Sequence, residues 1–153
     1  MGPVELKDLG GLAGQEIGVS DWLEITQERV NQFADATGDH QWIHVDVERA
    51  TGAIGGTIAH GYLVLSLIPF LGQGMLQLNG VAYALNYGTD KVRFTNMVRV
   101  GKRVRLRQKL VSAEPKGMGV LMKMECTIEI EGEAKPGCVA ETLAMLYPGA
   151  PVG

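Results

Sequence analysis

The run from Tyr62 to Leu71 carries no charged residue, and Ser66 is its only aliphatic hydroxyl. It belongs to a predicted helix from Ile58 to about Leu71 that is apolar almost all round, so this helix must be enclosed on most sides. The run is too short to span a bilayer, which favours a helix buried in a protein core. Pro69 should kink the helix or strain its last turns, because proline lacks a backbone donor and its ring clashes with the preceding turn.

Segments with alternating apolar and polar residues follow this helix. Met122, Met124 and Cys126, for example, alternate with charged and hydroxyl side chains, which is typical of an antiparallel sheet with one solvated face. Gly88 separates the first two of the five expected strands, which span Val81–Tyr87, Lys91–Thr95, Arg103–Val111, Leu121–Ile130 and Cys138–Tyr147. The sequence therefore predicts an α+β fold in which the antiparallel sheet curls around the long helix. Such a half-wrapped helix leaves sheet edges and apolar surface to hide, so a homodimer is expected.

The N-terminal part of the chain is less regular. Residues 1–18 are rich in glycine and weakly patterned, which indicates a loose arm that packs over the domain. Val19–Ile25 alternates well enough for a first strand. Thr26 is a good N-cap for a helix that ends at Gly38, and His40–Gly56 should form an irregular loop with one helical turn in it.

Composition limits the kinds of partner. The chain has 153 residues, enough for one domain with a substantial core over residues 1–153, and its formal net charge of −3 gives no reason to expect nucleic acid as a partner. Neither a secretory signal pattern nor a membrane span is predicted, which favours a cytoplasmic location. Cys126 and Cys138 lack metal-type spacing and a disulfide framework, so we expect free, partly buried thiols.

A carboxylate and an imidazole follow the first predicted helix. Asp39 comes directly after Gly38, His44 comes five residues later, and His60-Gly61 opens the apolar run. A carboxylate and a histidine on one loop can hold a single water and move protons at neutral pH. Each residue also has a purely structural interpretation. Asp39 can satisfy loop amides, His44 can be a hydrogen-bonded loop histidine, and His60 can simply lie at a helix N-terminus.

The order Phe33, Gly38-Asp39, His44 and then His60-Gly61 resembles the MaoC-like (R)-specific enoyl-CoA hydratases, a family that includes nodulation-protein-N-like members. The resemblance covers most of the chain. It departs from the family pattern at Gln41-Trp42, where Asn-Pro is frequent, but both residues that carry the chemistry are kept.

This resemblance implies a hot-dog fold and the reversible hydration of trans-2-enoyl-CoA to (R)-3-hydroxyacyl-CoA, without a metal or a redox cofactor. It implies that Asp39 and His44 are the catalytic pair, and that the Gly61 amide polarises the thioester carbonyl. It also implies an acyl-CoA or acyl-carrier-protein thioester as substrate. The residues do not indicate which of these carriers is used or how long the acyl chain is.

Three further residues are candidates for a supporting role. Family members can use a serine on the buried helix to hold the catalytic aspartate, but Pro69 aligns at that place here, which leaves Ser66 as the nearby hydroxyl. Ser66 can equally donate to a carbonyl one turn earlier. Asn86 could bond Asp39 or the substrate, or it could only close a turn. The third candidate is His60.

Three other functions fit parts of the pattern. Asp39, His44 and His60, together with His40, could cluster around a metal ion, although nothing in their spacing fixes them on one face. A hot-dog thioesterase would share the fold and the thioester, but it generally carries a carboxylate on the buried helix, which has no acid here after Gly61. A non-catalytic acyl-thioester-binding protein of the nodulation-N-like kind would keep the fold without the activity.

Overall fold

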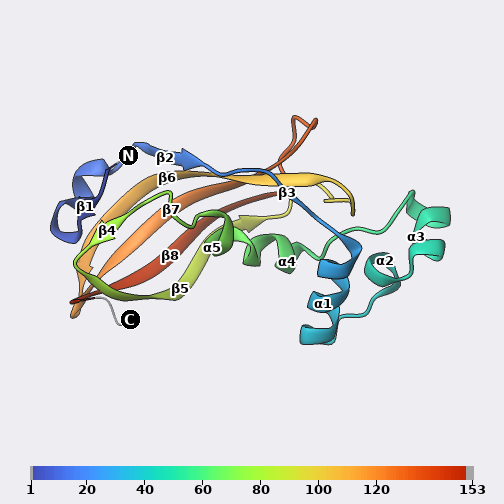
Figure 1. The fold of residues 1–153 in the computed structure, drawn as a ribbon, viewed down its shortest axis with the longest axis horizontal. Coiled ribbons are helices and arrows are strands. Elements are labelled where there is room, and N and C mark those ends of the chain that lie inside the picture. The colour runs from blue at the N-terminus through green and yellow to red at the C-terminus, as the bar shows by residue number, and fades with distance from the viewer. Residues whose placement is uncertain (1, 151–153) are drawn as a thin grey trace.

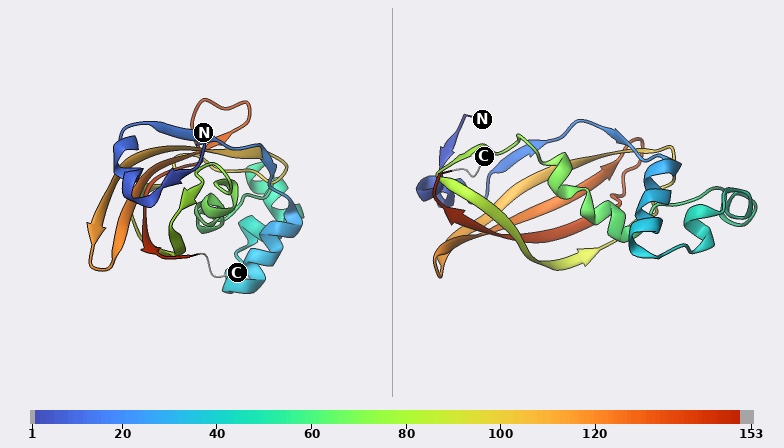
Figure 2. Two further views of the ribbon diagram at one scale, coloured as in Figure 1. Left: turned by 60° about the vertical axis from the view of Figure 1, so that its left-hand side comes forward. Right: turned by 60° about the horizontal axis from the view of Figure 1, so that its bottom comes forward.

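A curved antiparallel sheet wraps around two short apolar helices in the computed structural model, which describes residues 2–150 (Figures 1 and 2). Residues 1 and 151–153 of the predicted domain 1–153 lie outside this description. The strand order is β2-β6-β7-β8-β5, with β3 also paired to β6. These strands are β2 (Glu16–Val19), β3 (Leu23–Glu24), β5 (Val81–Arg93), β6 (Arg103–Lys116), β7 (Gly119–Ile130) and β8 (Cys138–Pro148). The predicted α+β hot-dog arrangement is confirmed.

The concave face of the sheet carries the core. Val104, Leu106 and Leu110 of β6 alternate with more exposed residues and are fully buried. In contrast to the prediction, Gly88 does not divide two strands, because β5 continues through it with a shift of register between Asn86 and Gly88. A glycine in a strand marks a bulge here rather than an end.

The predicted long helix is two short ones, α4 (Gly61–Ser66) and α5 (Ile68–Leu71). Pro69 lies in the first turn of α5, so proline interrupts the helix as expected. The start at Ile58 is wrong. Residues 57–60 are extended, because the Ala59 N–H donates to the Val98 carbonyl and the Val100 N–H donates to the Thr57 carbonyl.

The helical segment is enclosed on one side only. Leu63, Val64, Leu67 and Ile68 are buried, whereas Tyr62 is 71% exposed and Phe70 is 52% exposed. The single chain therefore leaves one side of the helical segment uncovered, as expected for a half-wrapped helix with apolar surface still to hide.

The N-terminal segment is not the loose arm that the sequence suggested. It contains β1 (Val4–Glu5), a 3-10 helix η1 (Leu6–Leu12) and β2, and the side chain of Leu9 is fully buried in the core. β1 pairs in parallel with β4 (Leu78–Asn79), which holds this segment over one end of the sheet (Figure 1). The expected strand over Val19–Ile25 is divided between β2 and β3.

Three helices lie beyond the opposite end of the sheet (Figure 1): α1 (Gln27–Thr37), α2 (Trp42–Val45) and α3 (Val47–Ile54). The predicted bounds of α1 are confirmed. The Thr26 hydroxyl accepts from the Arg29 N–H at 3.1 Å, and Gly38 closes the helix in the left-handed conformation. The segment expected to be a mostly irregular loop is more helical than predicted. Asp46 caps α3 by accepting from the Arg49 N–H at 3.1 Å.

The two cysteines are free and buried, as expected. Burial raises the pKa of the Cys138 thiol to about 11 and also raises the pKa of Cys126, so both stay protonated at neutral pH. Among residues 2–150, no helix has the length and apolar character needed to cross a membrane.

Candidate active site

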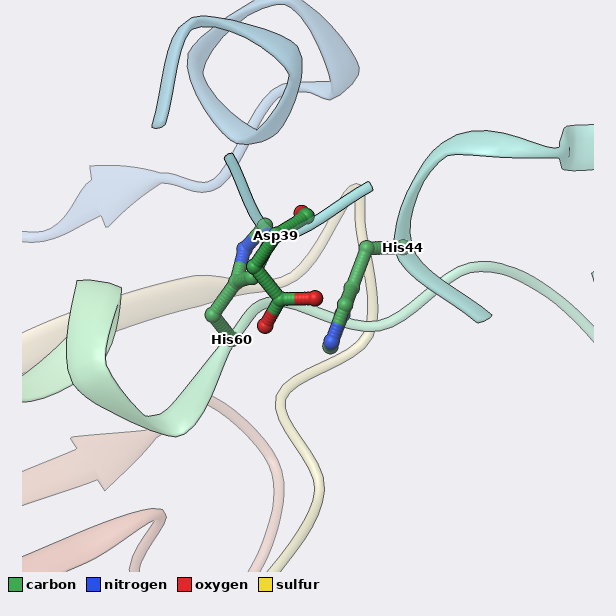
Figure 3. Close-up of side chains that lie close together, drawn as sticks. All are labelled: Asp39, His44 and His60. Carbon is green, nitrogen blue, oxygen red and sulfur yellow. The ribbon is translucent and has the colours of Figure 1, made fainter. Parts of the chain in front are cut away.

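The structure brings Asp39, His44 and His60 together where the α1–α3 region meets the start of α4 (Figure 3). One side-chain donor or acceptor atom of each lies within 4.8 Å of those of the other two. Asp39 is exposed in the loop after α1, whereas His44 on α2 is 6% exposed and His60 before α4 is 3% exposed. Three segments that are separated in sequence thus meet at one small cluster.

Hydrogen bonding fixes the tautomer of His44. Its Nδ1 lies 2.7 Å from the carbonyl oxygen of Ile58, and a carbonyl can only accept, so Nδ1 carries the proton. Nε2 is then an acceptor with a free lone pair. The backbone is held as well, because Gln27 Nε2 donates to the His44 carbonyl at 2.8 Å while Gln27 Oε1 accepts from the Thr57 hydroxyl at 2.6 Å.

Asp39 is oriented by backbone groups and a histidine rather than by a serine. The Gln41 N–H donates to Asp39 Oδ1 at 3.3 Å, and the Asp39 carbonyl accepts from His60 Nε2 at 3.0 Å. Ser66 instead donates to the Tyr62 carbonyl at 2.6 Å, which is the structural alternative weighed for it. The local turn thus provides an orientation for Asp39 that does not depend on a serine at position 69.

His60 connects the other two residues. Its ring stacks on His44 with a centroid distance of 3.8 Å and an interplanar angle of 21°, and the Phe33 ring packs against it at 4.8 Å. Because Nε2 donates to Asp39, Nδ1 carries a lone pair, and this buried atom has no hydrogen-bond partner within the described part of the chain. His60 therefore contacts both the Asp39 backbone and the His44 ring.

A cavity of about 440 Å³ adjoins these side chains, and His44, Gly61, Val64 and Phe94 are among its lining residues. Gly61 is the first residue of α4, so its N–H has no acceptor within the helix. The Phe94 ring lies directly on Gly61, and a Cβ added there would come within 2.8 Å of it. The N–H of Gly61 and the imidazole of His44 are thus two of the polar groups of a mixed wall that also includes Thr95 and Asn96.

The arrangement is suited to activating one water molecule. A carboxylate oxygen of Asp39 lies within 4.8 Å of a ring nitrogen of His44, a separation that one water molecule can bridge by hydrogen bonds. Figure 3 shows the Asp39 carboxylate turned toward the His44 ring. Both groups accept, so the two hydrogens of the water can point at them while its oxygen lone pair points away.

The same residues do not suit a metal ion. The His44 and His60 rings are stacked, so an ion about 2 Å from a nitrogen in the plane of one ring would lie far out of the plane of the other. His40, the fourth member of the predicted cluster, points elsewhere. It pairs with Asp35 at 3.0 Å, and this hydrogen bond raises its pKa.

Two predicted supporting residues lie elsewhere. Asn86 on β5 and Ser66 on α4 both line a second cavity farther along the helical segment. Sequence reasoning did not single out Gln27, Thr57 or Phe94 as parts of the site. Thr57 contacts Gln27 and Phe94 contacts Gly61, and each of these pairs is 30 or more positions apart in the sequence. No local sequence pattern indicates such contacts.

The chain is similar in sequence and in fold to known proteins. The sequence profile of the MaoC-like domain matches residues 8–131. The chain is 54% identical over 138 residues to 3-hydroxyacyl-thioester dehydratase Z of Mycobacterium tuberculosis, which covers 89% of this chain and 91% of that protein. It is 42% identical over 149 residues to nodulation protein N of Rhizobium meliloti, covering 95% of this chain and 92% of that protein. The solved (R)-hydratase PhaJ1 of Pseudomonas aeruginosa superposes with a TM-score of 0.73 at 22% identity, over 90% of this chain and 83% of that chain, which shows a shared fold.

Proposed function

This chain belongs to the MaoC-like dehydratase family, and from that premise we propose that it catalyses the reversible hydration of trans-2-enoyl-CoA to (R)-3-hydroxyacyl-CoA. The observation that carries the proposal is the Asp39 carboxylate within 4.8 Å of a ring nitrogen of His44, where His44 and Gly61 line the same cavity. The relative at 54% identity is named a 3-hydroxyacyl-thioester dehydratase. Dehydration of a 3-hydroxyacyl thioester is the reverse of the proposed hydration. Loss of enoyl-thioester absorbance without release of free thiol tests the reaction.

The proposed mechanism uses one water. Asp39 and His44 Nε2 accept hydrogen bonds from it, and one of them takes a proton as the water oxygen forms its bond to C3. The electron pair of the C2–C3 double bond moves toward the thioester oxygen, where the Gly61 N–H stabilises the developing negative charge. A proton then passes to C2 from the same side, which completes a syn addition and regenerates the catalytic pair.

His60 serves as a positioning residue in this mechanism. Replacing it with phenylalanine keeps an aromatic ring against His44 and loses a single hydrogen bond, because Nδ1 has no partner among the described residues. The Asp39 carbonyl is then left unsatisfied and the loop can shift. We expect His60→Phe to lower kcat about 10- to 100-fold with little change in KM, since small displacements of a catalytic group have effects of this order.

His40→Phe is the matched control for that variant. It changes the histidine next to Asp39 in the loop after α1, whose ring pairs with Asp35 outside the cluster, and it should leave kcat unchanged. Steady-state kinetics and thermal midpoints of both variants separate positioning from loss of stability. A wild-type kcat in His60→Phe would show that the His60 hydrogen bond does not position Asp39.

We also propose that the chain works as a homodimer. β5 is an edge strand of the sheet, and its Tyr83, Leu85 and Tyr87 are each more than half exposed, as are Tyr62 and Phe70 on the helical segment. An exposed apolar edge strand is prone to pair with another chain. Light scattering should give twice the chain mass of 16.5 kDa, and Leu85→Lys should give single chains. A monomeric wild type at micromolar concentration would contradict the proposal.

The thioesterase alternative is less favoured by the site. Neither α4 nor α5 contains a carboxylate, and the acid beside the histidines comes instead from the loop after α1. The carrier of the acyl group and the cytoplasmic location stay predictions of the sequence.

A further inference from the structure

A second cavity lies farther along the helical segment than the first one. It has a volume of about 500 Å³ and lies between the helical segment and the inner face of the sheet. Gly61 lines the first cavity, and Leu65 and Ile68 line the second. These residues are spaced by four and then three positions, so they share one face of the helix. The two cavities therefore follow each other along a single surface.

The wall of this second cavity carries polar groups where the fold calls for apolar ones. Gln108 lies on β6 between Leu106 and Leu110, whose side chains are inward and fully buried, so its own side chain faces the same way. It lines the cavity together with Thr142 of β8. A polar side chain facing a core costs free energy unless it is hydrogen-bonded.

These polar groups are only weakly satisfied within the chain. Gln108 Nε2 donates to the Cys126 sulfur at 3.6 Å, and the same sulfur lies 3.5 Å from the Thr142 hydroxyl. A thiol is a weak hydrogen-bonding partner, so the amide and the hydroxyl keep most of their capacity for another group. Gly72, at the end of α5, leaves room for the amide, since a Cβ there would lie 3.4 Å from Gln108 Oε1.

We infer that this cavity holds the distal part of the acyl chain, and that Gln108 and Thr142 favour chains that carry a hydroxyl or carbonyl oxygen over plain hydrocarbon chains. The inference rests on the proposed hydration. Ile68 lies about 10 Å along the helix from Gly61, at 1.5 Å per residue, so a medium-length acyl chain extends into this cavity and a crotonyl group does not. An oxygen there forms hydrogen bonds that a methylene cannot form.

The test compares trans-2-decenoyl-CoA with its 10-hydroxy counterpart. The wild type should hydrate the hydroxylated substrate with a kcat/KM roughly fivefold to tenfold higher, the factor that one net hydrogen bond supplies. Gln108→Met has a side chain of similar length without the amide, and Thr142→Val is close to isosteric. Each variant should reduce this preference, and the double variant should abolish or reverse it.

Crotonyl-CoA is the internal control. Its kcat/KM should stay the same in all variants, which shows that they are folded and that the catalytic pair is intact. Equal rates for the two decenoyl substrates in the wild type, or a preference that persists in the double variant, would overturn the inference. If neither crotonyl-CoA nor the decenoyl-CoA substrates are hydrated at all, the proposed function fails instead. In that case the dissociation constants of trans-2-decenoyl-CoA and its 10-hydroxy counterpart, measured by calorimetry, show whether the cavity prefers the hydroxylated chain.

Discussion

Asp39→Asn should lower kcat for enoyl-CoA hydration by about two to four orders of magnitude, the range typical for loss of a general acid–base group. Asparagine keeps a side-chain oxygen that can accept from the Gln41 N–H, so the turn that orients position 39 is retained. What is lost is a group that can take a proton from the attacking water. KM should change little, since the acid acts on the transition state more than on bound substrate.

Asp35→Asn is the matched control, because it removes an acid of the same region that pairs with His40 and takes no part in the cluster. It should leave kcat within about twofold of the wild type, as expected for a surface charge whose ion pair is worth little. His44→Gln should resemble Asp39→Asn, and the double variant should be little worse than either single one, because residues that act as a unit are not additive. A wild-type rate in Asp39→Asn would remove Asp39 from the mechanism.

Gly61→Pro should lower kcat/KM by about two to three orders of magnitude relative to Gly61→Ala when both are made in a Phe94→Ala background. This is the cost of losing one preorganised donor to a developing oxyanion. Proline removes the N–H and suits the first position of a helix, and the preceding residue, His60, already has the extended conformation that proline requires. Phe94→Ala removes the ring that would clash with any Cβ at position 61.

The two double variants differ only in the presence of the N–H and the closure of the proline ring. Thermal midpoints within a few degrees of each other would show that both retain α4. Equal activity of the Pro and Ala variants would show that the amide is not the donor. If Gly61→Ala alone is impaired and adding Phe94→Ala restores its activity, the Phe94 ring is the reason that position 61 requires glycine.

Local periodicity was sufficient for much of the sheet. β6 and β8 begin at the predicted residues, Arg103 and Cys138, and β7 ends at the predicted Ile130. Alternation reports which face of a strand is buried, and that information lies within the strand itself. Gly88 was misinterpreted as an end because a bulge depends on the partner strand, which lies far along the chain.

The sequence indicated three residues that the structure brings together, Asp39, His44 and the supporting candidate His60, and their catalytic roles stay predictions. It did not indicate the contacts that hold them in place. The extended conformation of residues 57–60 and the contact of Phe94 with Gly61 depend instead on pairing with residues more than 30 positions away. Such long-range contacts override the local helical pattern, and a single sequence does not show them.

The central claim is tested most directly by incubating the wild-type protein with crotonyl-CoA and trans-2-decenoyl-CoA while following the enoyl-thioester ultraviolet absorbance. Chiral analysis of the product and a free-thiol assay are run on the same samples. The account predicts rapid loss of absorbance, formation of the (R)-3-hydroxyacyl thioester and no release of free coenzyme A. Release of free coenzyme A would identify a thioesterase, an (S) product would contradict the proposed geometry, and no turnover of either substrate would contradict hydration of acyl-CoA.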